Sequence, residues 1–342
     1  MRRSDVLLDV RGLKIYFGTY LGTAKIIDDV TFQIKKGDTV ALAGETGCGK
    51  SLTAKAILRT IPSPPGMIAG GEILFDGIDI LRVSESELQK IRGNRISMIP
   101  QDPMTALNPV FTIGEQMTDL ILWQAKSKIA IAWLLQTKFD RKLKKKVWNK
   151  AVEMLQTLRI PSSELIIKRY PMELSGGMRQ RVLIAMALSG DPTLLLADEP
   201  ATALDVTIQE KINAQLKERI SNQKLSMLYV THDLGIAKKL CNRINIMYAG
   251  RVVESASVNK LFIDPLHPYT IGLLESIPRF SGISSEGMSG MIPNYVNPPK
   301  GCRFHPRCPS RMNICGEVAP TLQEIKSDHM VACHLHAKEG GN

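Results

Sequence analysis

Short apolar runs separated by glycines dominate the first hundred residues. Residues 6–10 and 30–34 have the pattern typical of antiparallel strands, and glycines at positions 70, 71 and 77 mark a further hairpin. Residues 39–43 form a short apolar run that predicts a strand, and residues 52–58 have the composition of a helix. This part of the chain is therefore predicted to be α/β, with an antiparallel β layer.

The pattern changes twice further along the chain. Residues 102–172 are mostly helical by composition, whereas residues 178–250 return to an alternation of strands and helices. At residues 297–309, turn-forming residues become frequent and apolar residues few. We therefore predict a main α/β domain over residues 1–260, with a helical subdomain at about 102–178, followed by a small extension over residues 261–342.

Between the predicted strand 39–43 and the helix that follows, residues 44–51 match the phosphate-binding pattern G-x-x-x-x-G-K-[ST] at every fixed position. Its glycines let the backbone wrap closely around phosphates, and the helix N-terminus adds positive potential. Lys50 is expected to reach the β- and γ-phosphates of ATP, and Ser51 to ligate Mg²⁺. The nucleotide contacts predicted here are Gly44, Glu45, Thr46, Gly47, Cys48, Gly49, Lys50, Ser51 and Leu52.

A second acidic element follows the apolar run 194–197, which has the continuous hydrophobicity of a buried parallel strand. The run ends in Asp198 and Glu199. Asp198 is expected to hold Mg²⁺, and Glu199 to polarise the water that attacks the γ-phosphate.

Between these two elements, residues 174–181 read L-S-G-G-M-R-Q-R. Ser175 is expected to cap a helix whose first turn can bind an anion. With this string, the phosphate-binding loop and the two acidic residues, the chain resembles the ATP-binding cassette (ABC) ATPases. The resemblance implies catalytic roles for Gln101 and His232, a Mg²⁺ contact for Gln101, and nucleotide contacts from Ser175, Gly176, Gly177, Gln180 and Asp205.

The same resemblance implies a RecA-like core with an antiparallel β layer and an inserted helical subdomain. It also implies a dimer in which each ATP lies between the phosphate loop of one subunit and the Ser175 region of the other. An aromatic side chain is expected to stack on adenine. Phe17 matches the family position best, with Tyr16 and Tyr20 as alternatives.

Composition limits how such an ATPase could reach a membrane. No apolar run approaches the roughly 18–20 residues of a membrane span, and Asp9 comes too early for a signal peptide. The net charge is +11, with a basic run at residues 126–150. This run is interpreted as a solvated helix face or a contact with anionic lipids. Nucleic acid is not expected as a partner, because Trp148 is the only aromatic that interrupts the later part of the run.

Four cysteines in the extension suggest a metal site. Cys302, Cys308, Cys315 and Cys333 have the spacing C-x5-C-x6-C-x17-C, wider than in most structural zinc sites. A [4Fe–4S] cluster, zinc and free thiols all stay open, with the cluster favoured. Cys48 is interpreted as a small residue that fits its loop, with redox regulation as the alternative, since a helix N-terminus tends to lower a thiol pKa.

The extension also resembles that of the oligopeptide/dipeptide importer ATPases, through H-P-Y-T at residues 267–270 and L-L-E-S-I-P at 273–278. The expected function is therefore an ATP-hydrolysing subunit on the cytoplasmic face of the membrane, which powers peptide import through two permease subunits and, indirectly, a solute-binding protein. Nickel, glutathione and sugar importers are the alternatives. A DNA-repair ATPase is disfavoured, since residues 102–172 are too few for a coiled-coil insertion. Whether the ATPase dimer is homo- or heteromeric stays open.

Overall fold

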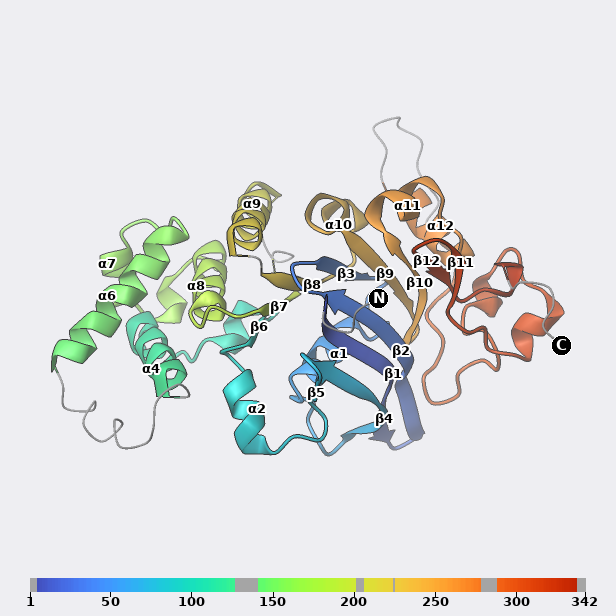
Figure 1. Ribbon diagram of the computed structural model, residues 1–342, viewed down its shortest axis with the longest axis horizontal. Coiled ribbons are helices and arrows are strands. Elements are labelled where there is room, and N and C mark those ends of the chain that lie inside the picture. Colours follow the sequence, from blue (N-terminus) through green and yellow to red (C-terminus); the bar gives the residue numbers. More distant parts are fainter. Residues whose placement is uncertain (1–4, 127–140, 201–205, 224, 278–287, 337–342) are drawn as a thin grey trace. The chain divides into compact units, whose positions relative to one another are not determined.

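The structure is a computed structural model that describes residues 5–126, 141–200, 206–223, 225–277 and 288–336 (Figure 1). The chain divides into two compact units. One unit combines the two ends of the chain, residues 1–82 and 228–342, and the other comprises residues 83–227. Each unit is described by itself below.

The first unit contains an antiparallel sheet with the strand order β2-β1-β4-β5. Its strands are β1 (Val6–Thr19), β2 (Gly22–Lys35), β4 (Gly66–Phe75) and β5 (Ile78–Asp79). Leu8 pairs with Ile34 and Val10 with Phe32, which confirms the two strands predicted at the N-terminus, although both are longer than expected.

Only one of the predicted glycine turns in this sheet is correct. Gly77 lies in the turn between β4 and β5, but Gly71 lies within β4, beside a register shift against β1. Gly71 has φ +94°, and a Cβ there would lie 2.6 Å from the carbonyl oxygen of Gly12. A close approach between strands, not a turn, therefore explains this glycine.

The second sheet of this unit follows the order β11-β12-β10-β9-β3-β8. Strand β3 (Thr39–Ala43) is parallel to β9 (Arg243–Tyr248), whereas β10 (Arg251–Ser257) and β12 (His329–Val331) continue the sheet antiparallel. Strands β8 (Ser226–Thr231) and β11 (Gln323–Lys326) lie at its two ends within this unit. Within the described residues of this unit, the sheet is accompanied by α1 (Lys50–Ile57), α10 (Leu234–Leu240), α11 (Val258–Ile263) and α12 (Pro268–Glu275).

The C-terminal residues are ordered by this sheet and by buried aromatic rings. Strand β12 pairs with β10. Short 3₁₀ helices lie at His305–Arg307, Asn313–Gly316 and His334–His336. The rings of Tyr248, Tyr269 and Phe304 lie with their centroids 4.7–5.4 Å apart in edge-on and tilted arrangements. The C-terminal residues, few of which are apolar, are thus held in place by these aromatic rings and by strand pairing.

The second unit contains the parallel pair β6 (Ile96–Ile99) and β7 (Leu194–Asp198), together with most of the helices. The helices are α2 (Glu85–Ile91), α3 (Pro103–Ala106), α4 (Ile113–Lys126), α6 (Arg141–Thr157), α7 (Ser163–Ile166), the 3₁₀ helix η2 (Pro171–Glu173), α8 (Gly176–Leu188) and α9 (Val206–Gln223). Helices α4, α6 and α8 pack against one another (Figure 1). The helical composition predicted for residues 102–172 is confirmed where the structure describes them.

Helix α6 shows how the basic run is accommodated. Val147, Ala151 and Leu155 form its buried face, and the Trp148 ring packs directly over Gly114 of α4. The lysines at positions 142, 144, 145, 146 and 150 are exposed, as expected for a solvated face. Residues 127–140 of the run lie outside the described residues, and the contact with lipids stays a prediction.

Across the described ranges, none of the helices is both long enough and apolar enough to cross a membrane.

A buried carboxylate joins three elements of the C-terminal part of the chain, by which we mean the described residues from 251 to 336. Glu254 of β10 is fully buried and accepts hydrogen bonds from the amides of Leu266 and His267 at 2.8 and 2.9 Å, and from Nε2 of His329 on β12 at 2.7 Å. Nδ1 of His267 accepts a further bond from the amide of Tyr269 at 3.0 Å, which caps α12. Burial lowers the pKa of His267 to about 4, outweighing the opposite effect of Glu254.

Lowering the pH from about 6.5 to about 4 should therefore destabilise the C-terminal part. In this window the unfolded chain binds a proton at His267 that the folded chain does not, so the free energy of unfolding falls as pH falls, by at most about 3 kcal/mol. Hydrogen bonds also lower the pKa of Glu254 against the effect of burial, and this acts in the same direction. Thermal unfolding at a series of pH values measures the effect.

The control is His267→Asn, because an asparagine oxygen can cap the helix but does not titrate. This variant should lose part of the pH dependence. An unchanged pH profile would exclude His267 as its source.

Candidate functional site

The loop between β3 and α1 has three glycines with positive φ, and two of them are also closely packed. Gly44 and Gly49 have φ +155° and +109°. A Cβ at Gly44 would lie 2.1 Å from the carbonyl oxygen of Met247, and one at Gly49 would lie 2.4 Å from Cδ1 of Ile27. At Gly47, which has φ +86°, nothing lies within 4 Å of the same position. The loop is thus tightly packed at its two ends and open at its middle.

The start of α1 is arranged to receive an anion. Gly49 is its N-cap and, having no side chain, gives the first turn no side-chain cap. Nζ of Lys50 is held within the loop by the carbonyl oxygens of Gly44 and Glu45, at 2.8 and 2.9 Å, and Lys50 is only 5% exposed. Open space at Gly47, a helix N-terminus and a fixed ammonium group together fit a polyphosphate.

Cys48 lies inside this loop but is not an activated thiol. Its side chain is completely buried, and burial raises the pKa of the thiol even though Lys50 acts in the opposite direction. The lowered pKa considered for a redox role is therefore wrong, because desolvation outweighs the nearby positive charge.

Two further predicted residues lie in the same unit. His232 is exposed directly after β8, and Phe17 lies half-buried on β1, where its ring packs against Gly66. Of the alternatives to Phe17, Tyr16 donates its hydroxyl hydrogen to Asp28 over 3.3 Å, and Tyr20 is fully exposed. The stacking role of Phe17 stays a prediction.

The acidic residues lie in the other unit, at the end of β7. Asp198 and Glu199 are 2% and 8% exposed, and Glu199 has φ +44°, a left-handed conformation that non-glycine residues rarely adopt. Nε2 of Gln101, which follows β6, lies 3.3 Å from Oε2 of Glu199 and donates to it. Because β6 and β7 are parallel neighbours, their carboxyl ends bring the predicted glutamine and glutamate together.

The signature string forms the start of α8 in the same unit. Ser175 is exposed, and its Oγ accepts a hydrogen bond from the amide of Met178 at 3.4 Å, which confirms the predicted N-cap. Gly176 is half-buried, whereas Gly177 and Gln180 are buried. Asp205 lies outside the described residues.

The predicted metal site of the extension is wrong. Among the described residues, which include all four cysteines, no group of three or more His, Cys, Asp or Glu side chains is arranged to hold a metal ion. This excludes the [4Fe–4S] cluster and the zinc alternative proposed for Cys302, Cys308, Cys315 and Cys333. Burial raises the pKa of three of these thiols, Cys302, Cys308 and Cys333, and so favours their protonated form.

Sequence reasoning missed three residues that contact the phosphate loop from the C-terminal part. Tyr269 and Arg307 contact Glu45, and Tyr295 contacts Gly47. In the sequence, Tyr269 is marked only as part of the H-P-Y-T string. These contacts join residues more than 220 positions apart, so no local pattern could have indicated them.

Comparison with known families agrees with this geometry. Residues 27–202 match the family described as ABC transporter, and residues 253–315 match the one described as oligopeptide/dipeptide transporter, C-terminal region. The chain is 45% identical to the oligopeptide transport ATP-binding protein AppD of Bacillus subtilis, over 98% of both chains. It is 39% identical to the oligopeptide transport ATP-binding protein OppD of Escherichia coli, over 99% of this chain and 96% of the relative.

A solved structure is also similar. It is a dimeric structure of an ATP-binding cassette in a post-hydrolysis state, bound to ADP and Pi, with 25% identity and a TM-score of 0.62 over 73% of this chain and 98% of that one. The chain thus has the α/β fold of an ABC ATPase cassette. It belongs to the ABC transporter ATP-binding proteins, in the oligopeptide/dipeptide transporter group.

The buried thiols give a direct test of the packing around the loop. In the native protein Cys48 and Cys241 should resist alkylation, because both are buried and the pKa of Cys241 is raised to about 12. Cys302, Cys308 and Cys333 are more exposed and should react before them. Mass spectrometry of alkylated peptides, with urea-unfolded protein as the control, measures this order. Native modification of Cys48 as fast as Cys308 would contradict the buried position of Cys48.

Proposed function

We propose that this chain is the ATP-binding and ATP-hydrolysing subunit that powers import of di- and oligopeptides through partner membrane subunits. The observation that carries the proposal is the loop at residues 44–51, whose glycines, helix N-terminus and fixed Lys50 form a cradle for polyphosphate. The peptide substrate is supported by the match of residues 253–315 and by the names of the relatives.

ATP binding is assigned to the loop and to the residues that resemble the family. The β- and γ-phosphates would contact Lys50 and the loop amides, and Phe17 would stack on adenine. Ser51, Gln101 and Asp198 offer the oxygen ligands that Mg²⁺ prefers. The metal ion would neutralise charge on the phosphates. The remaining nucleotide contacts would come from Gly44–Leu52, Ser175–Gly177, Gln180 and Asp205.

Hydrolysis is assigned to three side chains. Glu199 would polarise the attacking water, with Gln101 orienting it and His232 stabilising the charge that develops on the γ-phosphate. The hydrogen bond from Gln101 to Glu199 supports this pairing, because the amide fixes the direction of the carboxylate. The left-handed backbone of Glu199 is consistent with a residue held in a fixed position for function.

The proposed assembly is a dimer with the same chain or a related ATPase. Ser175 caps α8 and is itself exposed, so it can face the ATP of a partner subunit. The dimeric cassette among the similar structures supports this arrangement. Two permease subunits, and a solute-binding protein indirectly, would complete a transporter in which this subunit lies peripherally on the cytoplasmic face. No nucleic-acid partner is expected.

The domain organisation is part of the same proposal. Residues 1–260 would form the nucleotide-binding domain, with an inserted helical subdomain at about 102–178 that contacts the permeases. Residues 261–342 would form a C-terminal extension. The packing of α4, α6 and α8 supports the helical subdomain.

Glu199→Gln should preserve ATP binding but nearly abolish turnover, because it removes the charge that acts on water and leaves the phosphate loop intact. Steady-state hydrolysis and nucleotide titration measure the two effects separately. Turnover within about threefold of wild type, less than about 1 kcal/mol in the barrier, would show that Glu199 is not the catalytic base. The matched variant Lys50→Ala should instead weaken ATP binding itself.

The protein should dimerise when ATP is bound and hydrolysis is blocked. In Glu199→Gln with MgATP, each γ-phosphate would be held by Lys50 of one subunit and Ser175 of the other. Size-exclusion chromatography with light scattering should show a monomer without nucleotide and a dimer with it. A monomer under both conditions would instead favour pairing with a different ATPase subunit.

A further inference from the structure

The C-terminal part of the chain holds the phosphate loop directly. Nη1 and Nη2 of Arg307 donate to the two carboxylate oxygens of Glu45, at 2.8 and 2.9 Å. The Arg307 side chain is 6% exposed, and its Nε donates to the carbonyl oxygen of Ser289 at 3.0 Å. Such a two-pronged ion pair fixes orientation as well as distance. The guanidinium group therefore determines where the Glu45 side chain points.

Two tyrosines contact the same loop. The hydroxyl of Tyr295 donates to the carbonyl oxygen of Gly47 at 2.8 Å, and burial raises the pKa of Tyr295, so the hydroxyl keeps its proton. The backbone of Tyr295 is itself fixed, because its carbonyl oxygen accepts from the amide of Lys25 at 2.8 Å. The hydroxyl oxygen of Tyr269 accepts from the amide of Glu45 at 2.9 Å.

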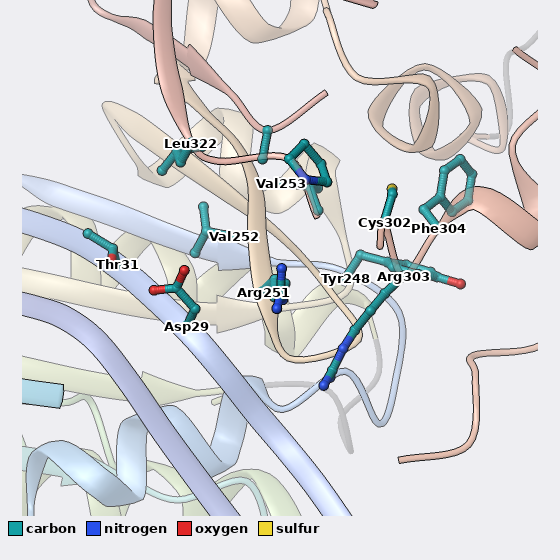
Figure 2. Close-up of a pocket in the computed structure, with 12 residues that line it drawn as sticks. Asp29, Thr31, Tyr248, Arg251, Val252, Val253, Cys302, Arg303, Phe304 and Leu322 are labelled. Atoms are coloured by element: carbon teal, nitrogen blue, oxygen red, sulfur yellow. The ribbon is translucent and has the colours of Figure 1, made fainter. Parts of the chain in front are cut away.

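A second arginine anchors this part of the chain beside the loop. Arg303 has a buried side chain, 4% exposed, which donates to the carbonyl oxygens of Ala249 and Lys25 at 2.6 and 3.1 Å and to Asp28 at 3.0 Å. Figure 2 shows Arg303 extending from the C-terminal part towards the N-terminal strands. A small cavity of about 50 Å³ adjoins it, lined in part by Asp29, Arg251 and Phe304. These contacts of Arg303 hold the segment between Tyr295 and Arg307 in a fixed position beside the loop.

The charge of Glu45 explains why the loop needs this support. A carboxylate within a loop that receives polyphosphate opposes binding through repulsion between like charges. Arg307 neutralises that carboxylate and keeps it turned towards the C-terminal part. The loop also contains three glycines with positive φ, whose freedom must be lost when the loop closes around phosphates. Holding Glu45 and Gly47 reduces that loss before the nucleotide arrives.

We propose that Arg307 and Tyr295 are positioning residues for the phosphate loop, through which the C-terminal part sets the affinity for ATP. The proposal rests on the nucleotide-binding function proposed above. It assigns these residues no contact with the reacting atoms. Their loss should therefore raise the Kd and KM for ATP more than it lowers kcat.

The first experiment compares full-length Arg307→Gln and Tyr295→Phe with Arg311→Gln, a matched change at an exposed arginine of the same region. Arg307→Gln should raise the Kd for MgATP by about tenfold or more, and Tyr295→Phe by about threefold. At saturating ATP, kcat should stay within about threefold of wild type. Arg311→Gln should bind and hydrolyse ATP as the wild type does.

The second experiment separates neutralisation of charge from general stability. If Arg307 acts by cancelling the charge of Glu45, Glu45→Gln combined with Arg307→Gln should bind ATP more tightly than Arg307→Gln alone. A purely structural role predicts no such rescue. Arg307→Lys, which keeps the charge but not the fork, should lie between wild type and Arg307→Gln.

Two outcomes would overturn the proposal. Wild-type affinity in both Arg307→Gln and Tyr295→Phe would overturn it. So would a loss of ATP binding in Arg307→Gln that the added Glu45→Gln does not relieve. Should Arg307→Gln fail to fold, Arg307→Lys and Tyr295→Phe give the same comparison. If the wild-type protein binds no ATP, or binds it as Lys50→Ala does, the proposed function itself fails; otherwise only this inference is affected.

Discussion

The packing around the phosphate loop depends on the absence of two side chains. The backbone of Gly44 passes so close to the carbonyl oxygen of Met247 on β9 that no Cβ fits there. A Cβ at Gly49, where φ is +109°, would displace the end of the Ile27 side chain on β2. These contacts bring a loop from the first sixth of the chain against strands from both sheets of its unit. Lys50 and the start of α1 then acquire fixed positions, and the remaining contacts of the site are built around them.

The same close packing decides the chemistry of the side chains nearby. At Cys48 a helix start and Lys50 would lower the pKa of the thiol, yet complete burial raises it. Arg307 donates two hydrogen bonds to the carboxylate of Glu45 beside the loop. Burial, more than proximity to charge, thus determines which groups around the loop can ionise.

Sequence alone predicted the local elements well, because each has a local cause. The apolar run at residues 39–43, the glycines of the loop and the cap at Ser175 each specify a strand, a turn or a helix start within a few residues. The Gly71 prediction failed because a tight turn and a close strand approach both require glycine. The cysteine prediction failed because spacing along a chain does not specify how side chains converge in space. The contacts from Arg307 and Tyr295 span about 250 residues, and no periodicity carries that information.

The pairing of the two chain ends has a thermodynamic consequence. Residues 1–82 and 228–342 form one unit, so the phosphate loop reaches its final surroundings only when the C-terminal part is packed. If that packing raises the affinity for nucleotide, bound nucleotide must stabilise the packing by the same free energy, because coupling between two equilibria is reciprocal. The ion pair of Arg307 and Glu45 couples nucleotide binding to the packing of the C-terminal part. A metal cluster is therefore not required to explain why a segment poor in apolar residues is ordered. Strand β12, the aromatic rings and two buried arginines order this segment. Binding of nucleotide at the loop can add to their effect.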